Sequence, residues 1–267
     1  FNITRLVTAP LGDPVSSIIF PSIISVSTET DREECARIME RYNLLTLPVT
    51  DEHGRLVGTL KIEDMIFVLQ EEATEDMYRM VGVDEEEKLL SPIALSIKGR
   101  FPWLFINLIT VGFAAVVITL FQSTLSQVLA LAVFIPVIAG QGGIAGTQTL
   151  TLVVRSMALG EIRKSDSARL LLKELFIGLI HGFLLGLIAG LVAYFWHGSE
   201  YIGAVVAVAM FGNLIVAGIS GASLPLILKA LHVDPALASA VAVTTVTDVI
   251  GLVLYLGLAT ILLPLIA

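Results

Sequence analysis

Residues 236–264 read ALASAVAVTTVTDVIGLVLYLGLATILLP, an apolar run long enough to cross a lipid bilayer as one helix. Its acidic residue, Asp248, lies near the middle of the run. Because a helix rises about 1.5 Å per residue, that position corresponds to mid-membrane. A carboxylate there costs about 2.5 to 3.5 kcal/mol on insertion scales, and such residues usually mark pathways for ions or substrates. We therefore predict that Asp248 lies in an ion pathway; a protonated carboxyl bonded to a neighbouring helix is the structural alternative.

Polar and small residues surround Asp248 along the same helix. Thr244 and Thr245 lie one turn before it, and Gly251 lies one turn after it, on or near the same face. Threonine hydroxyls can instead bond their own backbone carbonyls, so they are a weaker signal than the acid. We expect Thr244, Thr245 and Gly251 to line the pathway with Asp248.

The whole chain has the composition of a membrane protein. Its 267 residues are 55% hydrophobic, which is too apolar for an ordinary soluble domain of this length. From residue 101 onward, five stretches reach the roughly 20 residues needed to cross a bilayer. They lie at about 102–121, 128–158, 174–196, 201–228 and 236–264.

Lysine and arginine occur in alternate connections between these stretches. Lys98 and Arg100 precede the first stretch, and Lys229 lies in the fourth connection, whereas the first and third connections and the C-terminal tail hold none. The second connection holds Arg155, Arg163, Lys164, Arg169 and Lys173. Because Lys and Arg accumulate on the cytoplasmic side, we expect a multi-pass protein of the cell inner membrane, with its N-terminal module in the cytosol and its C-terminus outside.

The net charge of -8 belongs entirely to the first hundred residues, which carry 18 Asp and Glu against 10 Lys and Arg. Such a surface attracts cations rather than nucleic acid. Up to residue 69, the pattern predicts a small two-layer α/β module in the order β-α-β-β-α. Residues 70–100 follow as an acidic connecting helix or linker, with acid clusters at 71–76 and 84–87. These clusters read as a solvated helix face, while their position at the membrane entrance keeps a cation-sensing role open.

Residues 140–148, GQGGIAGTQ, place four glycines in the second stretch, a run that should weaken or break a helix. Irregular backbone at membrane depth is tolerated around watery cavities, and freed carbonyls suit a hard cation. Close packing through a GxxxG pair is the alternative. In the third stretch, glycines recur every fourth residue from 178 to 190, where we expect packing. For the run itself we expect these residues to line the pathway: Gly142, Gly143, Gly146 and Gln148.

The charged groups of the five stretches indicate the sign of the ion. No Lys or Arg lies deep in them, so an anion pathway lacks a counter-charge. One carboxylate per chain is a sparse cation site, but a two-fold dimer would bring two copies of Asp248 to a shared axis. Carboxylate, threonine and carbonyl oxygens suit Mg²⁺, and no set of soft ligands favours Zn²⁺ or Cu⁺. No phosphate-binding loop, catalytic triad or hydrolase motif is present, so we expect passive transport and no enzyme.

At these residues the chain resembles the MgtE family of magnesium channels and transporters. The matching motifs are INLITVGFAAVVI, LALAVFIPVIAGQGGIAGTQTLTLVVRSMALGEI and DPALASAVAVTTVTDVIGLVLYLGLA, in the first, second and fifth stretches. The resemblance implies a homodimer with five spans per subunit and a pore at the interface. It also implies that Asp248 of each subunit holds a largely hydrated Mg²⁺, helped by the backbone near Thr244. The asparagine usual in the family's glycine run is Ile144 here, so no role is carried over to that position.

The N-terminal residues resemble the end of a tandem CBS region. VSSIIFPSIISVSTETDREECARIMERYNLLTLPVTDEHGRLVGTLKIEDMI looks like a whole second repeat, and FNITRLVTAPLGDP looks like the tail of the first. CBS nucleotide sites often have Ser or Thr three residues before the acid at Asp64, where this chain has Lys61, so binding of an adenine nucleotide is not assumed. In relatives, cytosolic Mg²⁺ bridges acidic groups of this region and closes the pore. That behaviour implies regulatory roles for Glu71, Glu72, Asp76 and Asp234.

Together, these patterns predict an α-helical membrane protein in three parts: a CBS-type module (1–69), an acidic connecting helix or linker (70–100) and a five-helix pore domain (101–267). The expected partners are a second copy of the chain, membrane lipid and Mg²⁺. The expected function is passive transport of magnesium, gated by cytosolic Mg²⁺. Two alternatives remain open: a membrane-anchored CBS sensor of nucleotide or ion that transports nothing, and a transporter for another divalent cation such as Co²⁺ or Mn²⁺.

Overall fold

The computed structural model of the chain describes residues 7–10, 12–14, 23–84, 86–162, 166–237 and 240–266. The chain folds as two compact units, Phe1–Ala73 and Thr74–Ala267. Half of the expected tail of the first CBS repeat, and the start of the second repeat at 15–22, lie outside the described residues. So do Arg163 and Lys164, two of the cations used to predict the orientation in the membrane.

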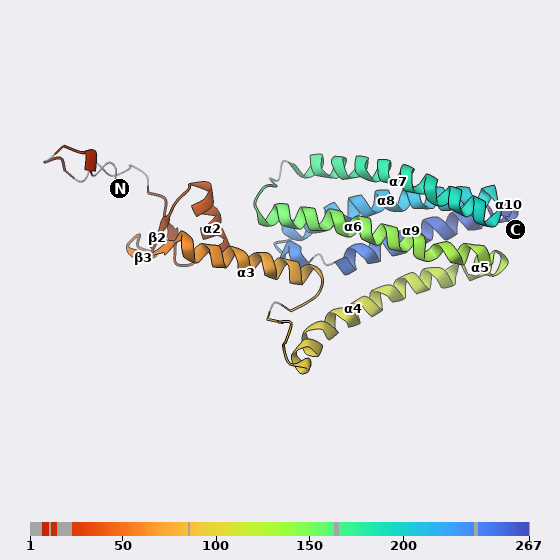
Figure 1. Cartoon of the computed structure of the whole chain (residues 1–267), viewed down its shortest axis with the longest axis horizontal. Coiled ribbons are helices and arrows are strands. Elements are labelled where there is room, and N and C mark those ends of the chain that lie inside the picture. The colour runs from red at the N-terminus through yellow and green to blue at the C-terminus, as the bar shows by residue number, and fades with distance from the viewer. Residues whose placement is uncertain are drawn as a thin grey trace. The chain divides into compact units, whose positions relative to one another are not determined.

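The first unit contains a three-stranded sheet, and its strands and helices follow the predicted order β-α-β-β-α. Strand β1 (Val26–Ser27) pairs in parallel with β2 (Thr46–Thr50), which pairs antiparallel with β3 (Leu56–Lys61). Helix α2 (Arg32–Arg41) lies between β1 and β2 in sequence, and α3 (Ile62–Met80) follows β3 (Figure 1). The boundary between the two units falls within α3, so its last residues are counted with the second unit.

Helix α2 begins where Asp31 caps its first turn, accepting a hydrogen bond from the Glu33 backbone N–H at 2.8 Å. Its buried face packs Cys35 and Met39 against strand and α3 side chains, which form the core of this unit. Burial, followed by the nearby acidic side chains, raises the pKa of the Cys35 thiol. The thiol therefore stays protonated and unreactive at neutral pH.

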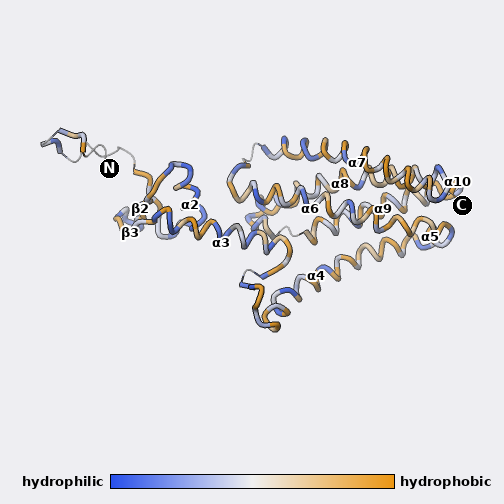
Figure 2. The backbone as a smooth tube through the Cα atoms, in the orientation of Figure 1, coloured by the Kyte–Doolittle hydropathy of each residue, from blue (hydrophilic) through white to orange (hydrophobic). Residues whose placement is uncertain are grey.

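The second unit is a bundle of long apolar helices. Among the described residues, five helical segments are long and apolar enough to cross a membrane, which confirms the predicted number of spans. They are α4 (Ile93–Leu120), the continuous η2 (Leu129–Phe134) and α6 (Ile135–Ala158), α7 (Ser167–His197), α8 (Glu200–Ala230) and α9 (Ala240–Ile261). Shorter elements are α5 (Gln122–Gln127), η4 (Pro235–Leu237) and α10 (Leu263–Ile266). Figure 2 shows hydrophobic residues distributed around the long helices rather than along one stripe, which is typical of helices that face lipid.

Helix α8 is the centre of the bundle. Of the 18 most apolar consecutive residues of α8, 56% are buried, against 6% of the corresponding residues of α4. Helix α7 packs on it through the regularly spaced glycines, since a methyl group on Gly178, Gly182 or Gly186 would lie within 3 Å of the α8 backbone. The predicted packing role of the glycine repeat is therefore confirmed.

The glycine run of the second stretch does not break the helix. Helix α6 is continuous through residues 140–148, so that expectation is wrong. Gly146 allows Val243 of α9 and the backbone of α8 to approach closely, and Gly221 of α8 contacts the Gly146 carbonyl. Close packing on two sides therefore compensates for the low helix propensity of glycine.

The connecting region is helical only in part. Helix α3 ends at Met80, and the described residues between it and α4 form turns. In this segment Gly82 lies against the Trp103 ring. Glu87 is only 5% exposed, and Arg100 donates to both of its carboxylate oxygens, at 2.5 and 2.9 Å. Hydrogen bonds from Arg100, followed by one from Ser96, hold the pKa of Glu87 below its usual value. Within this acid cluster Glu87 is thus a buried, paired group rather than part of a solvated helix face.

Candidate cation site

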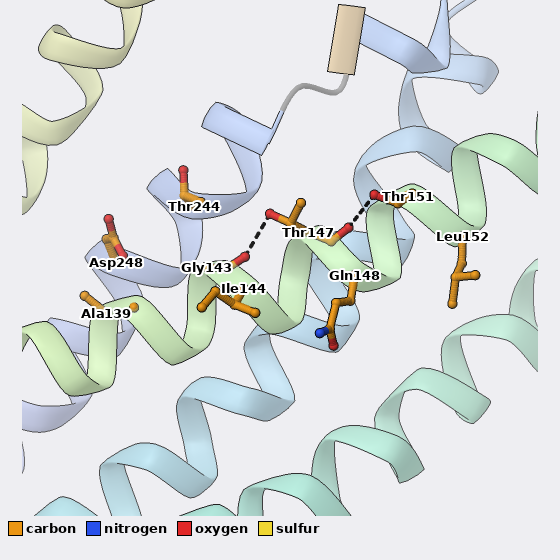
Figure 3. Close-up of a pocket in the computed structure, with 10 residues that line it drawn as sticks. Ala139, Gly143, Ile144, Thr147, Gln148, Thr151, Leu152, Thr244 and Asp248 are labelled. Carbon is orange, nitrogen blue, oxygen red and sulfur yellow. Dashed lines mark hydrogen bonds between the residues drawn. The ribbon is translucent and has the colours of Figure 1, made fainter. Parts of the chain in front are cut away.

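A pocket of about 880 Å³ lies along α6 beside the start of α9. Figure 3 shows Asp248 and Thr244 on α9 next to Ala139 and Gly143 on α6. The remaining lining residues follow α6 toward its C-terminal end: Gly140, Ile144, Thr147, Gln148, Thr151 and Leu152. The pocket therefore brings together four of the predicted pathway residues: Gly143, Gln148, Thr244 and Asp248.

Asp248 is the one acidic residue among those that line this pocket. It is partly buried, and in the described part of the chain no hydrogen bond or ion pair joins its carboxylate to another residue. The structural alternative, a carboxyl bonded to a neighbouring helix, is therefore not formed by the described residues. A carboxylate without a partner inside an apolar bundle is costly unless a cation or water meets it there.

Hydroxyl groups add oxygen atoms to the same lining. Thr147 Oγ1 donates to the Gly143 carbonyl at 2.9 Å, and Thr151 Oγ1 donates to the Thr147 carbonyl at 2.9 Å (Figure 3). Thr244 Oγ1 likewise donates to the Val241 carbonyl at 3.1 Å. Each hydroxyl proton is used within its own helix, so the lone pairs of the hydroxyl oxygen remain able to accept from a water or contact a cation. Such an all-oxygen set suits a hard divalent ion that keeps several waters.

The other predicted pathway residues lie elsewhere. Thr245 lines a separate apolar groove between α4 and α9, and its hydroxyl donates to the Val241 carbonyl at 2.6 Å. Gly142, Gly146 and Gly251 face the interior of the bundle, where they pack against side chains of α8 and α9. Ile144 lines the pocket itself, so the departure from the family's asparagine falls at the site.

The predicted regulatory acids fall in both units. Glu71 and Glu72 belong to the first unit and Asp76 to the second. Asp64, which is a candidate only as the acid of a CBS nucleotide site, is exposed at the start of α3. Asp234 forms an ion pair with Arg79 at 2.5 Å and also accepts a hydrogen bond from the Ala236 backbone N–H. Across the described ranges, no three His, Cys, Asp or Glu side chains gather closely enough to hold a metal ion.

Two buried polar residues were not predicted to matter. Glu174 is 4% exposed and accepts a hydrogen bond from Thr149 Oγ1 at 2.9 Å, two turns inside α7 rather than at its start. Asn213 is fully buried in α8 between α6 and α9. The hydropathy pattern places Glu174 at the edge of a span, and only the helix packing shows that it has a partner on α6.

Comparison with known proteins matches two family models to parts of this chain. Residues 135–258, which hold the pocket, match the family model MgtE, described as a divalent cation transporter. This confirms the MgtE resemblance. Residues 15–71 match the CBS domain, which confirms the CBS-type module.

Curated relatives of the MgtE type match along nearly all of the chain. A "Magnesium transporter MgtE" of Thermus thermophilus is 39% identical over 266 residues, which is 98% of this chain and 58% of that protein. A protein of the same name from Bacillus subtilis is 35% identical over 253 residues, or 94% of this chain and 56% of the relative. The chain thus spans a little more than half the length of these relatives.

Proposed function

We propose that this chain forms a membrane pore that carries Mg²⁺ passively, with Asp248 as the acid that attracts the ion. The observation that supports this most is the Asp248 carboxylate, which has no partner among the described residues and lines a largely apolar pocket that also contains threonine hydroxyls and the Gln148 amide. The magnesium transporters it resembles support the choice of ion. The function is transport rather than an enzymatic reaction.

The pore is proposed to form between two copies of the chain. The pocket runs along a face of α6 on which Gly140, Ile144, Gln148 and Thr151 are exposed in the single chain. The Thr151 hydroxyl already donates to the Thr147 carbonyl, but the Gln148 amide has no hydrogen-bond partner among the described residues. An unpaired amide that faces lipid is costly, so we propose that a second copy of the chain covers this face. A two-fold axis would also double the number of Asp248 carboxylates at the ion.

We place the pore in the cell inner membrane, with the CBS-type module in the cytosol and the C-terminus outside. The described cations support this orientation: Arg155 ends α6, and Arg169 and Lys173 begin α7, on the same side as Lys98 and Lys229.

Gating by cytosolic Mg²⁺ is proposed to involve the predicted acids of the connecting region. A cation that binds Asp234 must compete with the Arg79 guanidinium, which already contacts this carboxylate. The affinity of such a regulatory site therefore includes the loss of an ion pair. Binding of adenine nucleotide is not part of the proposal.

Flux of Mg²⁺ into proteoliposomes tests the function. Wild type is expected to show uptake, and Asp248→Ala and Asp248→Asn are expected to lose it while their oligomeric state in detergent stays unchanged. Asp64→Asn removes an exposed acid of the first unit and serves as the control with normal uptake. Absence of flux in wild type would favour the sensor alternative, and equal flux in Asp248→Ala would contradict the pore assignment. Competition by Co²⁺ or Mn²⁺ in the same assay decides the choice of divalent ion.

A further inference from the structure

Asn213 of α8 joins the two helices that line the pocket. Its side chain is fully buried, and its Nδ2 group donates to the Ile138 carbonyl of α6 at 2.8 Å. Its Oδ1 atom is also buried and has no hydrogen-bond partner in the described structure. A buried amide with one unpaired atom lowers stability relative to an apolar side chain of similar shape, so its presence requires a reason.

Two glycines on two different helices make room for this amide. A methyl group added to Gly251 of α9 would lie 2.6 Å from Asn213 Cγ, and one added to Gly142 of α6 would collide with Nδ2. The flat amide group of Asn213 therefore fills the space between α6 and α9. Because glycine has no side chain, the backbones at positions 142 and 251 approach this amide more closely than they could with any other residue there.

Both glycines adjoin residues of the cation site. Gly251 lies one helical turn beyond Asp248, and Gly142 precedes the pocket residue Gly143. Across the same interface, a Cβ atom on Gly143 would lie 3.1 Å from Thr244 Cγ2. The close contact between Gly143 and Thr244 at the pocket thus lies within about one helical turn of Gly142 and about two turns of Gly251, the glycines that contact Asn213. A change at Asn213 is therefore expected to alter the distance between α6 and α9 at the pocket.

We propose that Asn213 is a positioning residue that sets the spacing of α6 and α9 and thereby the discrimination between Mg²⁺ and Ca²⁺. This inference rests on the proposed transport function. Selectivity between these ions depends on cavity size, ligand number and rigidity, and Mg²⁺ demands the stricter geometry. A change in spacing therefore alters the flux of Mg²⁺ and Ca²⁺ unequally, whereas a loss of stability alone reduces both in proportion.

A cysteine pair provides a measure of the spacing that does not depend on transport. The Cβ atoms at positions 143 and 244 would lie 3.8 Å apart, close to the mean of about 3.8 Å in disulfides. In a Cys35→Ser background, the double variant Gly143→Cys with Thr244→Cys is expected to form a disulfide within one chain on mild oxidation. Adding Asn213→Ala is expected to change the oxidation rate by roughly threefold or more, since residues in contact couple to this extent.

Flux of the single variants measures the effect on selectivity. In proteoliposomes made without the cysteine pair, Asn213→Ala is expected to shift the Mg²⁺ to Ca²⁺ uptake ratio by roughly threefold or more. Ser220→Ala is the matched control, because Ser220 is also buried in α8 but bonds the Ala217 carbonyl of its own helix at 3.2 Å. The control is expected to keep both the ratio and the oxidation rate.

A second substitution tests the geometry directly. Gly251→Ala alone is expected to disturb the ratio, because its methyl group meets Asn213. Combined with Asn213→Ala, the same methyl group enters the space that the amide has left, so the double variant is expected to return toward the wild-type ratio. Equal or additive defects in the double variant would contradict the spacing role.

The two proposals fail in different ways. Unchanged oxidation rate and unchanged ion ratio in folded Asn213→Ala would overturn the inference while leaving transport intact. Loss of the difference between wild type and Asp248→Ala would instead overturn the proposed function, and the oxidation rate would still report on the spacing.

Discussion

At the scale of single residues, three acids of the second unit differ in whether a basic side chain balances their charge. Glu87 is held by Arg100 through both oxygens, and Asp234 by Arg79 through one. Asp248 has no such partner among the described residues. A carboxylate with an arginine partner is already neutralised, so the unpartnered one is the group most able to attract a mobile cation.

Glu87 gives a pH-dependent prediction at this scale. Its pKa in the folded state lies below the ordinary value of 4.5, so its pairing contributes stability above that pH and loses it as the pH falls through the lower folded value. Glu87→Gln is therefore expected to lower the midpoint of thermal unfolding at pH 7 and to differ less from wild type in acid. A difference that grew below pH 4.5 would contradict this assignment.

At the scale of helices, glycines act according to what lies opposite them. Gly186 of α7 faces the Ala207 carbonyl of α8, where a methyl group would lie 2.6 Å from the oxygen, whereas Gly112 of α4 has open space. Gly186→Ala is expected to destabilise the bundle by about 1 to 3 kcal/mol through overpacking. Gly112→Ala is the matched control, expected to be neutral or to stabilise by up to about 1 kcal/mol. Thermal unfolding in detergent measures both, and equal midpoints would argue against the α7–α8 contact.

Hydropathy predicts the helices well and their contacts poorly. The five spans follow from the length of apolar stretches, which reflects transfer of each segment into lipid by itself. The continuity of α6 through its glycine run, and the inward direction of Gly142, Gly146 and Gly251, depend on partners contributed by other helices. Asp248 could be found from its own cost in the membrane, whereas the burial of Asn213 could not.

At the scale of the whole chain, regulation is proposed to reach the pore domain through the end of α3. In the second unit, Met80 of α3 packs against a hydrophobic cluster that contains Val154 of α6 and Val243 of α9, and Arg79 pairs with Asp234 before α9. The last turn of α3 therefore packs against a cluster to which both helices of the candidate cation site contribute.

Opposite effects are expected from the two members of the Arg79–Asp234 pair. Asp234→Asn removes a ligand for regulatory Mg²⁺, so closure should require a higher cytosolic concentration. Arg79→Gln removes the competing cation, so closure should require a lower one. For a pair that is about one-third exposed, a shift of roughly two- to fivefold in each direction is expected. Flux measured against Mg²⁺ on the cytosolic face, with Arg41→Gln as control, decides; shifts of the same sign would contradict competition at Asp234.

In the proposed pore, the unbroken helix α6 also determines how far an ion would travel beside it. Its pocket residues run from Ala139 to Leu152, roughly 20 Å at about 1.5 Å per residue. That is about two thirds of a hydrocarbon core roughly 30 Å thick. Thr147 and Thr151 lie one helical turn apart on this length, so in the proposed pore an ion that leaves Asp248 would pass two hydroxyl oxygens of α6. The proposed pore would thus combine one strong cation ligand with a few weak ones, an arrangement that favours rapid release of the ion over tight retention.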